Sequence, residues 1–169
     1  MMFTKFWQNH NIATAILTVL RVWLGYHWLT AGWGKITGGF GTEGFLNNAV
    51  SLASGEHPAV AGWWAAFLEN FAIPNAGLFD VLIPYGEFLV GLGLLLGALT
   101  RSAAFFGLVM NMAFLLSGTV STNPTMLIVS VLILVAGHNA GKIGVDGLFL
   151  RRFVDTKVLH RSPNRQIAS

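Results

Sequence analysis

The sequence predicts an all-α integral membrane protein, a four-helix bundle with a long outer loop that contains short amphipathic helices. Hydrophobic residues make up 54% of the 169 residues and charged residues 10%, against about 25% charged residues in soluble domains. Four apolar windows meet or approach the roughly 20 residues that an α-helix needs to cross a hydrocarbon core of about 30 Å. A chain with so little polar surface needs lipid as its solvent.

The four windows are residues 12–36, 76–98, 102–120 and 125–141. The first is predicted not to be a cleaved secretory signal, because Arg21 interrupts the apolar run and no small-x-small cleavage site follows at a suitable place. We therefore expect one membrane domain over residues 1–146 and a basic tail over residues 147–169.

The positions of lysine and arginine predict the orientation. Residues 37–75 hold three glutamates and no lysine or arginine. The cations outside the spans are Lys5, Arg101, Lys142, Arg151, Arg152, Lys157, Arg161 and Arg165. Because short cytoplasmic segments carry the positive charge in membrane proteins, both termini should be cytoplasmic and the long loop should face outward in a multi-pass topology.

The long loop and the C-terminal tail should both lie at the membrane surface, beside the apolar spans. Apolar residues recur at helical spacing over residues 45–53 and again over 60–71, after Pro58. These two short amphipathic helices either form an aromatic belt that anchors the loop or form a lid over a cavity. The basic tail is predicted to be a juxtamembrane helix held by anionic lipid, with a docking site for a protein partner as the alternative.

Several ionisable or polar side chains fall inside the spans. A charge at the centre of a membrane helix costs about 2.5 to 3.5 kcal/mol, so such residues usually face the protein interior and have partners. Depth counted from the ends of the windows, at about 1.5 Å per residue, places Arg21, Glu87 and Asn111 at one level. The same count places His27 and Asp80 together at a level nearer the outer surface.

Two interpretations of the deeper level stay open. Arg21 and Glu87 form a buried ion pair with Asn111 as a hydrogen-bonding neighbour. Alternatively, the three residues form a site for an anion or a quinone headgroup, lined by Arg21 and Trp28.

Helical spacing also predicts that polar residues of the two levels lie along facing sides of the first two spans. Arg21, Trp28 and Lys35 are seven residues apart and share one face of the first helix, and Asp80 and Glu87 share one face of the second. Facing each other, they would bring Arg21 to Glu87, and either Lys35 or the histidine of the upper level to Asp80.

The composition excludes several kinds of site. The chain has no cysteine, which excludes disulfides, iron–sulfur clusters and thiolate metal sites. His27 and His138 differ by about 14 Å in depth, too far apart to share one haem iron. We therefore predict no metal site, and no nucleic-acid binding, because the formal charge of +3 is a topology signal.

Small residues predict close helix contacts. They are Gly25 with Gly32, Gly93-x-x-x-Gly97 and Gly137-x-x-x-Gly141. Packing within one bundle is the first interpretation, and a homo-oligomer is the alternative.

Ordered motifs along the chain resemble the DoxX family. They are Arg21-Val-Trp-Leu-Gly25, Gly32-Trp-Gly-Lys35, Glu87-Phe-Leu-Val-Gly91-Leu-Gly93, Leu99-Thr100-Arg101 and Ala140-Gly141-Lys142-Ile143-Gly144-Val145-Asp146. The long loop with its tryptophans makes the chain look closer to the DoxD-type subunit of thiosulfate:quinone oxidoreductase.

The resemblance implies a membrane subunit of a quinone-linked oxidoreductase in the bacterial cell membrane, acting on thiosulfate or a related small sulfur compound as a thiosulfate dehydrogenase (quinone). Quinone would be the electron acceptor, and a second oxidoreductase subunit or a soluble redox partner would be required. Arg21, Lys35, Glu87 and Asp146 match the family pattern.

The candidate site residues take roles from this chemistry. Arg21, Lys35, Asp80 and Asn111 are the predicted substrate-binding residues, and Glu87, Arg21 and His27 the predicted catalytic ones, with Glu87 or His27 relaying protons. Trp28 and Tyr85 would pack against the quinone ring. Two alternative functions are a non-catalytic scaffold or assembly factor for redox enzymes, and a small-solute or proton carrier.

Overall fold

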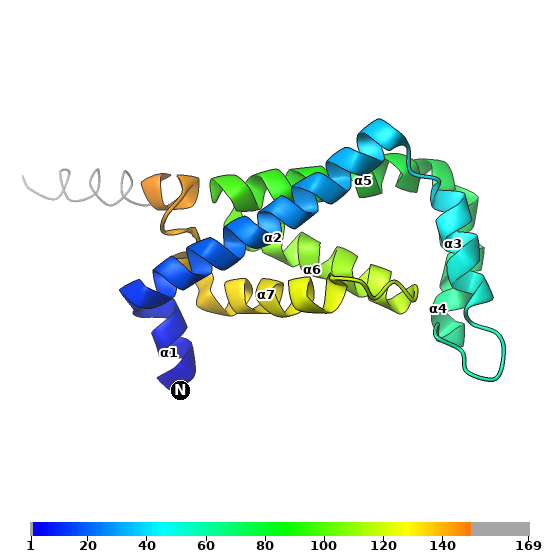
Figure 1. Cartoon of the computed structure of the whole chain (residues 1–169), viewed down its shortest axis with the longest axis horizontal. Helices are drawn as coiled ribbons and strands as arrows, with labels where there is room; N and C mark the ends of the chain where they lie inside the picture. The colour runs from blue at the N-terminus through cyan, green and yellow to red at the C-terminus, as the bar shows by residue number, and fades with distance from the viewer. Residues whose placement is uncertain (1, 150–169) are drawn as a thin grey trace, which may run out of the picture.

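The computed structural model describes residues 2–149 and contains helices and no strand in that part of the chain (Figure 1). The helices of the bundle are α2 (Asn11–Gly38), α5 (Ala76–Leu96), α6 (Thr100–Leu116) and α7 (Asn123–Ala136). The remaining helices are α1 (Met2–Asn9), α3 (Thr42–Ser51), α4 (Gly62–Phe67), a π-helical turn η1 (Leu68–Ala72) and the 3-10 turns η2 (Ile73–Asn75) and η3 (Gly137–Gly141). The all-α prediction is confirmed.

The two ends of the bundle carry different segments (Figure 1). Helices α3 and α4 lie across one end, which we call the loop end. Helix α1 and residues 137–149 lie at the other, which we call the terminal end. The two described ends of the chain therefore share one side of the bundle, and their cytoplasmic location stays a prediction.

The length and composition of the helices fit a membrane. Three helical stretches are long and apolar enough to cross it: Asn11–Gly38, Gly62–Leu96 and Asn123–Gly141. Helix α6 has 17 residues, the lower limit of the usual range of about 17 to 25. Large apolar side chains are exposed along the bundle, among them Val19, Leu89, Phe106 and Ile128. These side chains are the surface that lipid would cover, and a count of four spans stays a prediction.

Glycines set the contact between α2 and α5. An added Cβ on Gly25 would lie 2.9 Å from the backbone nitrogen of Leu95. A Cβ on Gly32 would overlap the backbone of Phe88, and one on Gly91 would overlap the backbone of Leu29. The predicted contact through Gly25 and Gly32 is confirmed, and it lies within one chain. Because the helices are antiparallel, these contacts fix which residues of α2 face which residues of α5.

The loop folds back onto the bundle. Leu46 and Ala49 of α3 form a buried cluster with Leu68 and Ala72 of η1. Trp64 donates a hydrogen bond of 2.9 Å from its indole Nε1 to the hydroxyl of Ser117, at the end of α6. The two predicted short helices are present, and their contacts with the bundle favour the lid interpretation.

Two helix boundaries differ from the prediction. The second loop helix is not separate from the second span, because α4 continues through η1 and η2 into α5. Pro74, which has no backbone N–H, lies where the helix changes from the π-helical turn η1 to the 3-10 turn η2. Helix α1 was not predicted, because its eight residues are too short to produce a clear apolar period.

The glycine contact yields a stability prediction. Gly32→Ala and Gly91→Ala should each destabilise the protein by about 1 to 3 kcal/mol, because the overlapping atoms are backbone and cannot rotate away. The matched control is Gly34→Ala on the same helix, where an added Cβ would meet nothing within 4 Å. Thermal unfolding in detergent measures the difference, and equal melting of all three variants would contradict the proposed contact.

Candidate functional site

A pocket of about 500 Å³ opens at the loop end, between the bundle and the loop; we call it the loop-end pocket. Helix α2 contributes most of one wall, with His27, Trp28 and Lys35. The other helices and the loop contribute Phe40, Phe45, Glu87, Phe114, Thr119, Ser121, Thr122, Asn123 and Met126. The pocket therefore combines aromatic walls with ionisable side chains.

Lys35 and Glu87 form an ion pair in the wall of the loop-end pocket. The Lys35 Nζ donates to both carboxylate oxygens of Glu87, at 2.8 and 2.7 Å. The Glu87 side chain is 1% exposed and that of Lys35 25% exposed. The predicted pair of Arg21 with Glu87 is wrong, and so is the predicted approach of Lys35 to Asp80. Glu87 has a charged partner, as its burial requires, but the partner comes from the loop end of α2.

Arg21 lies instead at the terminal end. Its side chain is buried, and its Nη2 donates a hydrogen bond of 2.6 Å to the backbone carbonyl of Ile143. The guanidinium fills the space beside Gly97 and Gly144, where an added Cβ would overlap it. Gly97 has a φ of 63° at the end of α5, a conformation that also favours glycine. Arg21 therefore ties α2 to the segment that follows α7.

The predicted pairing of Arg21 with Glu87 failed because α2 and α5 are offset along their length. Gly97 on α5 lies beside Arg21, and Glu87 is ten residues earlier (97 minus 87), about 15 Å further along the helix. The first residues of α2 extend past the end of α5, so the start of the apolar window was not a common reference level. Thr14 illustrates this extension, because its hydroxyl bonds Asn139 of η3 at 2.6 Å.

Asp146 organises the start of α6. Its two carboxylate oxygens accept hydrogen bonds of 2.8 Å from the backbone nitrogens of Leu99 and Thr100. Its own backbone nitrogen donates to the carbonyl of Gly97 at 2.8 Å. Asp146 also attracts Arg21 electrostatically. These contacts give a structural explanation for two of the residues that match the family pattern.

Three phenylalanines of the loop-end pocket were not predicted as site residues. Phe45 of α3 contacts Phe114 of α6 edge to face, with ring centroids 5.9 Å apart. The Lys35 Nζ lies 5.4 Å from the centroid of Phe40 and 5.6 Å from that of Phe114. For Phe45, the apolar period over residues 45–53 indicated a buried face, but it does not specify which bundle helix that face meets.

Trp28, which the spacing places on the same face of α2 as Lys35, and its neighbour His27 belong to the same wall of the loop-end pocket. Trp28 is 2% exposed, and its indole Nε1 has no hydrogen-bond partner within residues 2–149. His27 is half-buried, and its ring lies 4.4 Å from that of Trp23, measured between centroids. Both residues line the loop-end pocket.

The remaining predicted site residues lie elsewhere. Asp80 is exposed and accepts a hydrogen bond of 3.0 Å from the backbone nitrogen of Thr42, at the start of α3. Tyr85 is 53% exposed and does not line the pocket. Asn111 is buried, and neither atom of its amide has a hydrogen-bond partner among the described residues. The predicted hydrogen bond from Asn111 to the ion pair is therefore wrong.

The comparisons with known proteins give one match. Residues 16–120, more than half of the chain, match the family model described as DoxX. No curated protein and no solved structure matches the chain. The match confirms the resemblance to the DoxX family and does not distinguish the DoxD type, and its range includes Lys35 and Glu87 but ends before Asp146.

A double-mutant cycle tests which cation partners Glu87. At neutral pH, Lys35→Met should cost about 3 to 5 kcal/mol of stability, because it leaves a buried carboxylate without its counter-charge. Adding Glu87→Leu should recover much of this loss. The control cycle pairs Arg21→Met with Glu87→Leu, whose effects should add because the groups are far apart. Coupling in the Arg21 cycle and none in the Lys35 cycle would contradict the assignment.

Asp146 gives a local prediction. Asp146→Ala should destabilise the start of α6 by about 0.5 to 2 kcal/mol, because two backbone N–H groups lose their acceptor. Hydrogen exchange should accelerate at the amides of Leu99 and Thr100. The matched control is Asp80→Ala, which should accelerate exchange at Thr42 and leave α6 unchanged. Unchanged exchange at α6 in the Asp146 variant would show that this cap does not stabilise the helix.

Proposed function

The chain belongs to the DoxX family, and on that premise we propose that it is a membrane subunit of a quinone-linked oxidoreductase whose quinone ring binds in the loop-end pocket. The observation that supports this most is the buried Lys35–Glu87 ion pair in an aromatic pocket at one end of the bundle. Reduction of a quinone to a quinol consumes two electrons and two protons. A site for that reaction therefore needs both a flat apolar slot and groups that exchange protons.

The residues of the pocket fit such a ring. Its volume of about 500 Å³ is within the usual range of about 300 to 1,000 Å³ for small-molecule sites. Phe40, Phe45 and Phe114 provide apolar faces for stacking. The indole of Trp28 adds a further aromatic face to the wall, while its Nε1 is buried beside Gly107 and Val90.

The ion pair supplies the proton chemistry in this proposal. Lys35 donates a hydrogen bond to a ring oxygen and keeps Glu87 charged while the pocket is empty of substrate. As negative charge develops on that oxygen, Lys35 passes its proton to it while Glu87 stays ionised, and a proton relayed by His27 recharges Lys35, which restores the neutral pair. His27 lies at the edge of the pocket and relays protons from the loop side.

The electrons come from outside this chain. With no cysteine in the sequence, electron transfer depends on a donor bound by a partner subunit or on a direct contact between donor and ring. We propose thiosulfate or a related small sulfur anion as the donor, in line with the sequence resemblance. Arg21 is too far from the pocket to bind that anion there, so its proposed role changes from catalysis to positioning.

The proposal is tested by quinone-analogue reduction in membranes that contain the full chain and its cognate partner. Lys35→Met/Glu87→Leu should fold, and its turnover should fall by about 10² to 10⁴, the usual contribution of positioned acid–base groups. Trp28→Leu should mainly raise the quinone concentration required, because it removes an aromatic face of the wall and keeps an apolar side chain. Glu69→Gln, on the exposed side of η1, is the control and should have no effect.

Two results would overturn the proposal. One is a purified protein without bound quinone whose thermal stability does not respond to added quinone analogue. The other is normal turnover in the double variant. Either result with intact partner binding would favour the scaffold function.

A further inference from the structure

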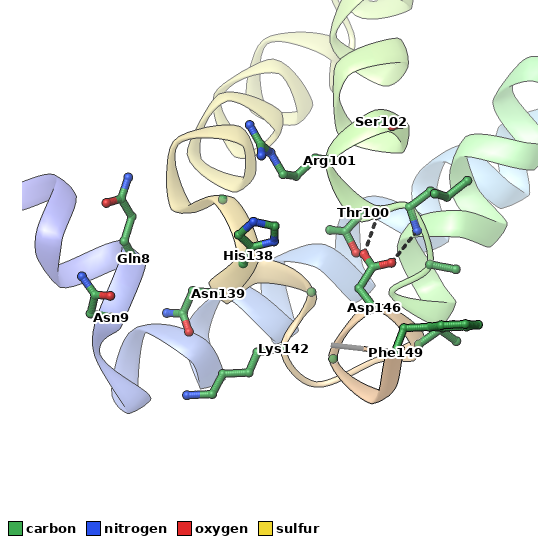
Figure 2. A pocket seen from close by; sticks show the side chains of 16 residues that line it. Gln8, Asn9, Thr100, Arg101, Ser102, His138, Asn139, Lys142, Asp146 and Phe149 are labelled. Atoms are coloured by element: carbon green, nitrogen blue, oxygen red, sulfur yellow. Dashed lines mark hydrogen bonds between the residues drawn. The ribbon is translucent and has the colours of Figure 1, made fainter. Parts of the chain in front are cut away.

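A second and larger cavity, of about 1000 Å³, lies at the terminal end of the bundle (Figure 2). We call it the terminal-end cavity. Its walls come from α1, the turn between α5 and α6, the first turn of α6, η3 and residues 142–149. None of the residues that line the loop-end pocket lines this cavity. A ligand in this cavity would therefore occupy a site separate from the proposed quinone site.

Positive charge dominates the polar side of the terminal-end cavity. The cations Arg101 and Lys142 line it together with the imidazole of His138, and all three side chains are exposed. In the view of Figure 2, His138 lies between Arg101 and Lys142. The acidic residue Asp146 also lines the cavity, but both of its oxygens are occupied by the backbone of Leu99 and Thr100. The lining therefore carries two cations against one carboxylate that is already hydrogen-bonded.

A buried hydroxyl adds a hydrogen-bonding group to the wall. Thr100 lines the cavity and is 1% exposed, and its Oγ1 has no hydrogen-bond partner within residues 2–149. It belongs to the first turn of α6, whose positive dipole end also favours an anion. Burying an unpaired hydroxyl costs free energy, and an oxygen of a bound ligand would remove that cost.

The other side of the cavity is apolar. Leu99 is 75% exposed and Phe149 is 61% exposed, and both line it. Large apolar side chains beside arginine and lysine are typical of the interface between headgroups and acyl chains. A free phosphate ion would leave these side chains in water, whereas a lipid would cover them.

We propose that the terminal-end cavity binds one anionic phospholipid, whose phosphate contacts Arg101, Lys142 and Thr100 and whose acyl chains cover Leu99 and Phe149. The proposal fits the predicted cytoplasmic orientation of this end, because the inner leaflet carries the anionic lipids. A lipid in this position would contact α1, α6 and the segment after α7 together.

The test uses the full chain in vesicles of phosphatidylcholine with phosphatidylglycerol as the minor component, followed by native mass spectrometry of the released protein. The wild type should retain one phosphatidylglycerol. Arg101→Gln should weaken its retention about fivefold, the effect of about one interfacial cation. The charge-matched control is Lys5→Gln, an exposed cation of α1 that does not line the cavity, and it should retain the lipid.

Two further variants separate a lipid from a free anion. Leu99 has a φ of 49°, a conformation that asparagine tolerates, so Leu99→Asn should fold normally while losing the apolar contact. It should weaken phosphatidylglycerol binding and leave the binding of inorganic phosphate unchanged. Thr100→Val should weaken both and keep thermal stability, because the hydroxyl has no partner within the described residues.

The outcomes decide between clear alternatives. Equal lipid loss in Arg101→Gln and Lys5→Gln would show a general surface attraction and would overturn the site. Unchanged lipid binding in Leu99→Asn, with phosphate competing fully, would show an anion site with no lipid specificity and would overturn the proposed occupant.

Discussion

The backbone contact between α2 and α5 is the constraint on which the two polar regions depend. Gly25, Gly32 and Gly91 let the helices approach until backbone meets backbone, a packing that small residues allow in membranes. Such a contact cannot slide by a residue without a clash, so it fixes the longitudinal offset of the helices. That offset places Lys35 within reach of Glu87 and Arg21 beside the end of α5.

The offset also explains how far the sequence could predict the site. Helix periodicity correctly placed the bundle helices and grouped Trp28 with Lys35 on one face. Depth is a different quantity, because it needs a reference plane shared by two helices. The apolar windows did not provide that plane, since α2 extends beyond α5 at the terminal end. Glu87 was therefore recognised as buried and paired, but the predicted partner was Arg21, near the terminal end of α2, and the observed partner is Lys35, near the loop end.

Contacts made by the loop were less predictable for another reason. An amphipathic pattern shows that a segment buries one face, but it carries no information on the surface that the face meets. Phe45 reaches Phe114 only because α3 lies across the loop end, where Asp80 holds the first amide of that helix. An acid predicted to bind substrate thus fixes the loop that closes the pocket. The predicted roles of the site residues stay predictions.

The division of cations between the two ends has a chemical logic. Arginine keeps its proton at any accessible pH and offers a rigid set of donors, which suits Arg21 as a permanent tie to a backbone carbonyl. Lysine loses its proton more readily when its surroundings are dry, and a lysine–glutamate pair is neutral as a unit. In the proposed reaction Lys35 gives up a proton and is recharged through His27, so that the Lys35–Glu87 pair returns to neutrality, whereas Arg21 cannot take part in such a transfer. If this protein moves protons to a bound ring, the loop end is the place where its own residues permit it.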